Sequence, residues 1–157
     1  MKTTTFESWH AITNLLYRYA ECIDLADFDG IEALFADAVM TNEGFDGEIR
    51  GGSAIGAIYR NFNKVHADGT LRTRHVTTNV IVEVDESADT ASCRSYFLVV
   101  QATEQIALQP IVSGRYHDRF VRVDGEWRFS HRHILMEGVG DVRDHLVVDV
   151  EAMRTRP

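Results

Sequence analysis

The 157-residue chain has only two cysteines and two prolines, no long apolar run and no basic cluster. Because no apolar stretch approaches the roughly 18 residues of a membrane helix, the sequence predicts no transmembrane span. No Lys/Arg cluster is longer than a pair, and the net charge is −8. These features argue against nucleic acid, which is bound mainly through its phosphates, and against anionic membrane surfaces.

Other absences bear on compartment and cofactor. Cys22 and Cys93 lie far apart in apolar surroundings, and the first ten residues lack the apolar core of a secretory signal. We therefore expect free thiols rather than a disulfide, and a cytoplasmic protein. The GxGxxG, Walker and nucleophile-elbow patterns are missing as well. The sequence thus predicts no nucleotide cofactor, and we expect the protein to work without any cofactor.

The first half of the chain reads as helical. Apolar residues recur at spacings of three and four along its first long segment, which is typical of a mostly buried helix. Ser53 is a candidate N-cap for a later helix. The predicted helices cover residues 6–26, 31–35 and 54–65, and two short strands are expected within residues 38–51.

The second half changes to the alternation typical of strands. Asp124-Gly125 predicts a tight hairpin between the last two. The long strands are expected over residues 71–84, 90–103, 111–123 and 126–136. Helices followed by antiparallel strands indicate an α+β fold, in which a curved sheet wraps the long helix as a cone with a ligand-sized mouth. We assign residues 1–137 to one domain and residues 138–157 to its C-terminal arm, which would cover the pocket or a neighbouring subunit.

Asp24 stands out at the end of the first predicted helix, within "ECIDLAD". A carboxylate there is repelled by the negative end of the helix dipole, so its presence has a cost that a functional role would explain. The alternative is that Asp24 only solvates the helix end, as Asp27 and Asp29 beside it would. Tyr19 lies five residues earlier and roughly shares its face, at about 100° per residue.

His75 opens the longest strand-like run, in "RTRHVTTN". With unbroken alternation it shares a face with Thr77 and Asn79, opposite a stripe of valines. Either the polar face lines a pocket, or it faces water and the valines form the core. Alternation alone leaves both readings open, and a bulge near Thr78 would switch the faces.

The order "LLYRYAECIDLADFDGIEALFADAV", "RHVTTNVIVEVD", "SGRYHDRFVRVDGEWRFSHRHI" resembles the SnoaL-like branch of the nuclear transport factor 2-like superfamily, over roughly residues 6–136. Within that branch the pattern is most similar to scytalone dehydratase, bile-acid dehydratase and hexachlorocyclohexane dehydrochlorinase. The resemblance implies a cone of antiparallel sheet packed on three helices. It also implies a catalytic pair formed by Asp24 and His75, and a small hydrophobic, polyketide- or steroid-like substrate.

Such a pair suits proton transfer. A neutral imidazole takes a proton near neutral pH, and a carboxylate on its other nitrogen fixes the tautomer and stabilises the imidazolium. No serine nucleophile is evident, so the base would act on a substrate C–H or on a water. The resemblance favours elimination, and the sequence therefore predicts a dehydratase-like lyase or isomerase.

Four further residues are candidates for binding substrate. Tyr19 and Tyr116 would polarise a substrate oxygen, and Arg132 would bind a carboxylate or enolate. Gln101 occupies a position where the resembling proteins carry a second His or an Asp. This departure removes the expected general acid, because an amide can only hydrogen-bond.

The remaining candidates are apolar or histidine. His131 and His133 share a strand face that could ligate a metal, but no further ligand is placed and the resemblance implies none, so we expect no metal. His10, His66 and His145 are expected at the surface. The pocket wall would comprise Trp9, Met40, Phe45, Tyr59, Phe62, Phe97 and Leu135, with Phe45 and Tyr59 touching the substrate.

A second class of function remains open, because one fold hosts many activities. The chain would then be a non-catalytic ligand-binding or assembly module, similar to a dioxygenase β-subunit. In either case we expect a small hydrophobic ligand and a homodimer or homotrimer. The distance between His75 and Asp24 discriminates the two, since a catalytic pair must lie within hydrogen-bond reach.

Overall fold

The computed structural model describes residues 4–43 and 45–147, and it has the predicted α+β fold. Its six strands form one sheet in the order β2-β1-β6-β5-β4-β3, antiparallel except for the parallel pair β1–β6. The elements are α1 (Phe6–Asp24), α2 (Phe28–Leu34), β1 (Val39–Asn42), β2 (Phe45–Arg50), α3 (Gly52–Phe62), β3 (Thr73–Asp85), β4 (Thr90–Gln101), β5 (Gln109–Val123) and β6 (Glu126–Val139).

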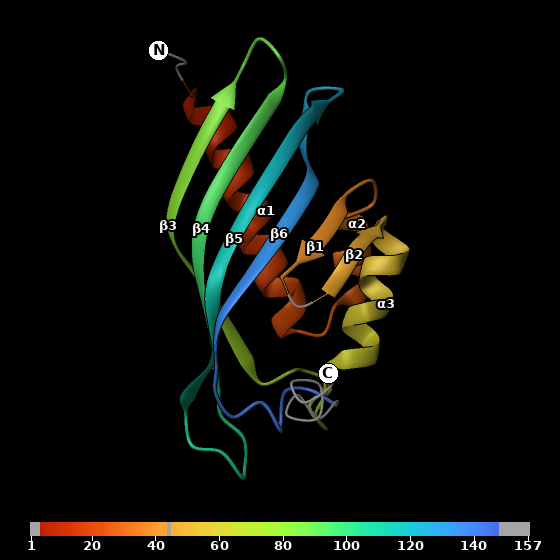
Figure 1. The fold of residues 1–157 in the computed structure, drawn as a ribbon, viewed down its shortest axis with the longest axis vertical. Helices are drawn as coiled ribbons and strands as arrows, with labels where there is room; N and C mark the ends of the chain where they lie inside the picture. Colours follow the sequence, from red (N-terminus) through yellow and green to blue (C-terminus); the bar gives the residue numbers. More distant parts are fainter. Residues whose placement is uncertain (1–3, 44, 148–157) are drawn as a thin grey trace.

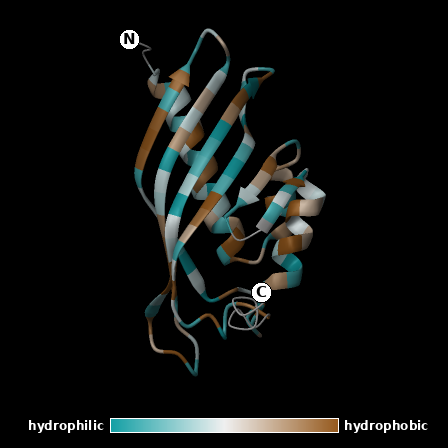
Figure 2. Cartoon of the chain, viewed as in Figure 1, coloured by the Kyte–Doolittle hydropathy of each residue, from teal (hydrophilic) through white to brown (hydrophobic). Residues whose placement is uncertain are grey.

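The long strands β3 to β6 curve around α1, while α2 and α3 lie beside the short strands β1 and β2 (Figure 1). Burial alternates residue by residue along β4, and Figure 2 shows hydrophobic and hydrophilic residues interspersed along the long strands. One face of the sheet is therefore available to pack on the helix, as an antiparallel sheet with one wet face requires.

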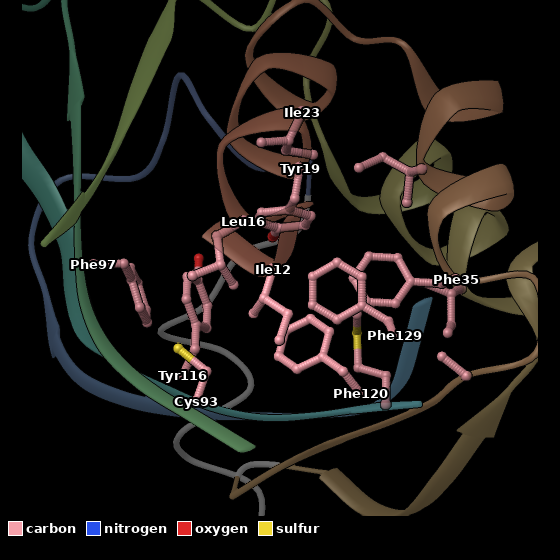
Figure 3. Packing of buried hydrophobic residues seen from close by; sticks show 14 of the residues in the cluster. Ile12, Leu16, Tyr19, Ile23, Phe35, Cys93, Phe97, Tyr116, Phe120 and Phe129 are labelled. Atoms are coloured by element: carbon pink, nitrogen blue, oxygen red, sulfur yellow. The ribbon is translucent and has the colours of Figure 1, made fainter. Parts of the chain in front are cut away.

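The core lies between α1 and the concave face of the sheet (Figure 3). Ile12, Leu16, Tyr19 and Ile23 follow one another at helical spacing and are at most 3% exposed. Burying an aliphatic or aromatic side chain of this size stabilises a fold by roughly 1.5–3 kcal/mol. This stripe holds the last turn of α1, and with it Asp24, firmly against the sheet.

Helix boundaries differ from the prediction where local hydrogen bonds intervene. α1 ends at Asp24 because Ala26 adopts a left-handed φ of 56°. α2 starts at Phe28, earlier than predicted, because Asp27 caps it by accepting a hydrogen bond from the Gly30 amide at 2.9 Å. The predicted Ser53 cap of α3 is wrong, since α3 begins at Gly52 without any side-chain cap.

A close approach explains the start of α3. A Cβ on Gly52 would lie 2.0 Å from the carbonyl oxygen of Glu32, so only glycine allows α3 to contact α2 there. The helix ends at Phe62, three residues before the predicted end, because Asn63 is extended. The following amide, that of Lys64, bonds instead to the carbonyl of His145 at 2.8 Å.

The strand predictions are confirmed with shifted ends. β6 continues to Val139, so residues 138 and 139 belong to the sheet rather than to the predicted arm. Asp124 and Gly125 both have positive φ, 53° and 84°, as the tight hairpin requires. Residues 140–147, here called the C-terminal segment, pack back on the fold, whereas residues 148–157 of the predicted arm lie outside the described residues.

A bulge in β3 resolves which way His75 points. Pairing with β4 shifts register between Thr78 and Ile81, and Asn79 has a left-handed φ of 53°, which asparagine tolerates better than most residues. Before the bulge His75 turns inward, and after it residues 80, 82 and 84 do. His75 thus faces the interior while the valines also pack on the core, and Asn79 is exposed.

Within residues 4–43 and 45–147 no helix is both long enough and apolar enough to cross a membrane.

Candidate active site

Asp24 and His75 meet where α1 ends and β3 begins. One carboxylate oxygen of Asp24, Oδ1, lies 2.7 Å from Nδ1 of His75 and accepts a hydrogen bond from the Thr73 hydroxyl at 2.6 Å. The other, Oδ2, accepts the backbone N–H of His75 at 2.9 Å. Because a carboxylate can only accept, Nδ1 of His75 carries the proton and Nε2 is left as the basic nitrogen.

The environment keeps Asp24 ionised. Burial by itself would raise the pKa of this carboxyl, but the hydrogen bonds from His75 and Thr73 outweigh it and hold the pKa below its usual value. These three hydrogen bonds also offset the unfavourable position at a helix C-terminus. The side chains of His75 and Asp24 are only 8% and 12% exposed, so the pair is shielded from water.

An arginine and two tyrosines form a second cluster beside the pair. The Arg132 guanidinium lies between two rings, 4.2 Å from the centroid of Tyr19 and 4.1 Å from that of Tyr116. Its Nε and Nη2 donate to the two carboxylate oxygens of Asp118, each at 2.8 Å, and both side chains are fully buried. The third nitrogen, Nη1, is buried and has no partner within the described residues.

The hydroxyls of Tyr59 and Tyr116 remain neutral. Tyr19 and Tyr59 share a hydrogen bond of 2.9 Å between their hydroxyl oxygens. Burial raises the pKa of Tyr59 and of Tyr116 well above the usual value, so both phenols keep their protons and can act as donors. Tyr19 connects this cluster to the Asp24–His75 pair, since its ring centroid lies 6.3 Å from that of His75.

Most of the predicted site residues therefore converge, whereas Gln101 binds backbone carbonyls and only the backbone of Phe45 is described. Gln101 is buried and its amide donates to the carbonyls of Leu71 and Asp144, both at 3.0 Å, so it holds backbone. Phe45 starts β2, where its backbone pairs with Asn42, and its side chain is outside the described part of the chain. The residues brought together are Asp24, His75, Tyr19, Tyr59, Tyr116 and Arg132.

Sequence reasoning missed three residues of the site: Thr73, Asp118 and His145. Thr73 lies two residues before His75 on the same strand face, a spacing that would have indicated it. The predicted surface position of His145 is wrong, because this residue is 7% exposed and its ring centroid lies 6.4 Å from that of His75. No periodicity marks it, since its burial depends on where the C-terminal segment folds back.

The pair His131 and His133 is engaged otherwise. The hydroxyl of Thr41 lies 3.1 Å from Nε2 of His131 and 2.7 Å from Nδ1 of His133. Among the residues that the structure describes, no three His, Cys, Asp or Glu side chains gather as metal ligands would.

Two hollows open at the surface, of about 470 and 760 Å³. The smaller lies between α1, α2 and the start of β6. The larger lies over the end of β3, the start of β4 and the end of β5. Neither is lined by Asp24 or His75. The ring of Tyr19 packs edge-on against that of His75, with the two centroids 6.3 Å apart.

Residues 4–133 match the family described as the SnoaL-like domain. The chain belongs to this family. Its membership confirms the resemblance to the SnoaL-like branch of the nuclear transport factor 2-like superfamily. Among curated proteins none matches the sequence.

Solved structures of the SnoaL-like type agree in fold. Rv3472 of Mycobacterium tuberculosis, a protein of unknown function, is 30% identical, with a TM-score of 0.69 over 86% of this chain and 79% of its own. Aln2 from a Streptomyces species is 27% identical, with a TM-score of 0.71 over 86% and 94%. LinA is 22% identical, with a TM-score of 0.65 over 87% and 90%, which shows the shared fold.

Proposed function

We propose that this SnoaL-like protein is a cofactor-free lyase or isomerase in which His75 acts as general base. The observation that carries the proposal is the 2.7 Å contact between Nδ1 of His75 and the buried carboxylate of Asp24. It fulfils the distance criterion for a catalytic pair. The same pairing is implied by the resemblance to scytalone dehydratase, bile-acid dehydratase and hexachlorocyclohexane dehydrochlorinase.

The chemistry follows from the tautomer. With its Nδ1 proton held by Asp24, the imidazole of His75 offers Nε2 to a substrate C–H. The imidazolium that results is stabilised by the ionised carboxylate, whose pKa is held low by His75 and Thr73. General-base catalysis of this kind contributes roughly 10²–10⁴ in rate.

The neighbouring cluster supplies groups for the substrate oxygen. Nη1 of Arg132 is buried and its N–H donors have no partner among the described residues, and the neutral hydroxyl of Tyr116 lies in the same cluster. Donors in a site shielded from water stabilise developing negative charge more strongly than donors in solution do. The aromatic surroundings favour a small ring substrate with few polar groups.

Proton exchange in D₂O tests the base directly, with 2-tetralone, a hydrophobic bicyclic ketone, as the probe. Wild-type protein is expected to speed exchange of the hydrogens next to the carbonyl, and His75→Ala to lose about 10²–10⁴ of that rate. Asp24→Asn should fall comparably, because the amide can present its N–H and leave His75 in the wrong tautomer. His10→Ala, at an exposed position on α1, is the matched control.

The assembly alternative is supported by a different observation. The outer face of the sheet carries exposed apolar side chains from β3 and β4, namely Val76, Tyr96 and Leu98. We propose a homodimer or homotrimer that covers this face, independent of catalysis. Light scattering of wild type and of Leu98→Glu tests it, and a monomeric wild type would exclude it. If wild type, His75→Ala and Asp24→Asn all fail to exchange 2-tetralone, the result favours a non-catalytic binding or assembly function.

A further inference from the structure

The C-terminal segment is fastened beside the catalytic pair by Asp144. Its carboxylate accepts from Lys64 Nζ at 2.9 Å and from the Thr103 hydroxyl at 2.6 Å. Its backbone carbonyl lies 3.0 Å from the Gln101 amide nitrogen and 2.9 Å from Nε2 of His66. Four contacts at one residue make this a preformed part of the structure, well connected to β4 and to the chain after α3.

Backbone pairing holds the segment on the other side of His145. The His145 carbonyl accepts from the Lys64 amide at 2.8 Å, and the Val147 amide donates to the Phe62 carbonyl at 2.9 Å. His145 is thus positioned between two anchored points. Side chains held in this way are precise enough to take part in catalysis.

One ring nitrogen of His145, Nδ1, is buried without a partner among the described residues. The residue is 7% exposed, and its Nδ1 makes no hydrogen bond within the described residues. Leaving a buried polar atom unsatisfied costs about 1–3 kcal/mol, so such an atom in a native structure calls for an explanation. Its ring centroid lies 6.4 Å from that of His75, so the unsatisfied nitrogen lies beside the proposed base, where a substrate atom would be its partner.

We infer that His145 is a second catalytic residue, a neutral imidazole that donates a hydrogen bond to a substrate carbonyl oxygen while His75 removes the adjacent proton. The inference rests on the proposed role of His75 and adds the substrate class, a small ring ketone with a C–H next to the carbonyl. The carbonyl oxygen of such a ketone would accept the hydrogen bond that His145 donates.

The electrostatics fit a neutral donor. The pKa of His145 is lowered to about 4, mainly by burial and also by the positive charge of a protonated His75, whereas Asp24 opposes the shift. His66 also faces it from the connection after α3 and disfavours its charge. His145 therefore polarises an oxygen without protonating it. An uncharged imidazole serves the same purpose in triosephosphate isomerase.

The step balances without a co-reactant. The substrate C–H bond breaks and its proton goes to Nε2 of His75, while the electron pair forms a C=C bond. The π pair of the carbonyl moves to oxygen, and the resulting enolate accepts the hydrogen bond from His145. Return of a proton from His75 to the same carbon gives exchange; in a ketone with a β,γ double bond the enolate is extended, and return of the proton to its γ carbon completes an isomerisation. Loss of hydroxide is disfavoured, because the neutral imidazole of His145 donates a hydrogen bond but does not protonate a leaving group.

Gln101 gains a role in this arrangement. Its amide joins the carbonyl of Leu71, which leads into the strand of His75, to that of Asp144, which adjoins His145. One side chain thus ties both histidine-bearing segments together. The residue that replaces the expected acid on β4 instead holds the segment that brings a second histidine.

The experiment compares His145→Phe, His145→Asn and His75→Ala in the exchange of 2-tetralone. His145→Phe should lower kcat about 10²–10³-fold, the usual effect of removing one donor to an oxyanion, with KM changed less than about threefold. His145→Asn should recover at least about tenfold, because its amide restores a neutral N–H near the position of Nδ1. His10→Ala is the control.

Three outcomes decide the matter. If His75→Ala loses activity while His145→Phe keeps it, the base assignment stands and the role of His145 is overturned. If His145→Asn is as poor as His145→Phe, the residue only packs, and the inference is likewise overturned. If His75→Ala also keeps full activity, the proposed function itself has failed, and the inference falls with it.

A binding measurement covers the case in which variants misfold or the ketone is not turned over. The probe is 2-naphthol, whose oxygen stands where an enolate oxygen would. Its addition to ¹⁵N-labelled wild type should shift the imidazole nitrogen resonances of His145 and His75, but not that of His10. An unchanged His145 resonance at saturating 2-naphthol, or no binding at millimolar concentration, contradicts the inference.

Discussion

Lowering the pH from 7 to 5 should destabilise the protein mainly through His145, with a smaller contribution of the same sign from the half-buried His131. The pKa of His145 is lowered to about 4 in the folded chain, mainly by burial, whereas an unfolded histidine titrates near 6.5. Between these values the unfolded state binds more protons than the folded one. Stability is therefore fully present above pH ~6.5 and is lost as the pH falls towards 4.

The magnitude follows from the two pKa values. Each pKa unit corresponds to ~1.4 kcal/mol, so the whole interval amounts to ~3 kcal/mol, of which ~2 kcal/mol is lost between pH 7 and 5. For a domain of this size, ~2 kcal/mol lowers the Tm by roughly 4–8 °C. Asp24 attracts a proton on His145, while His75 and His66 repel it. Asp24 itself titrates below this window, because its pKa is lowered from an already acidic value.

Urea unfolding at pH 7 and pH 5 measures the effect in wild type, His145→Asn and His10→Asn. Asparagine does not titrate, so His145→Asn should lose ~2 kcal/mol less than wild type on acidification. His10 is exposed, and His10→Asn should follow wild type. If wild type and His145→Asn show the same pH dependence, the ring of His145 is not buried and uncharged as described, and the reasoning is refuted.

Three other substitutions probe the surroundings of the site. Thr73→Val removes a hydrogen bond to the carboxylate of Asp24; we expect a loss of about 1.5–3 kcal/mol in urea unfolding and an upward shift of the Asp24 pKa in an NMR titration. Asp118→Asn leaves Arg132 buried and unpaired, and should cost about 3–5 kcal/mol, more than replacing both residues by leucine and methionine; the reverse order would contradict this. Gln101→Leu leaves two carbonyls without their donor, and hydrogen exchange should accelerate in the C-terminal segment while α1 amides stay protected.

The fold was predictable because its signals are local. The stripe that includes Ile12, Leu16 and Tyr19 repeats at helical spacing, and Asp124-Gly125 has the residues that a tight hairpin needs. Helix ends were less predictable, since Gly52 begins α3 through a backbone approach to another helix rather than through a cap. Contacts of this kind leave no mark in the adjacent sequence.

The contact between Asp24 and His75 was predictable only through a resemblance, because alternation allowed His75 to face either way. The bulge at Asn79 shifts the alternation by one residue, so that His75 before it and Val80 after it both turn inward. Gln101 and Arg132 illustrate a different limit. Their chemistry was evident, yet whether each binds a ligand or the protein itself depends on partners, such as Asp118 and Asp144, that are distant in sequence.

Local sequence patterns were enough to predict the fold class, a long first helix that contains Asp24 and a long strand that contains His75, since these follow from periodicity and turn chemistry within short windows. Only the tertiary structure decided that the two meet at 2.7 Å and that His145 lies beside them. The physical reason is that burial and hydrogen bonding between residues tens of positions apart depend on how the whole sheet curves around the helix. Electrostatic interactions among the carboxylate, the two imidazoles and the guanidinium become strong only when that packing excludes water from them.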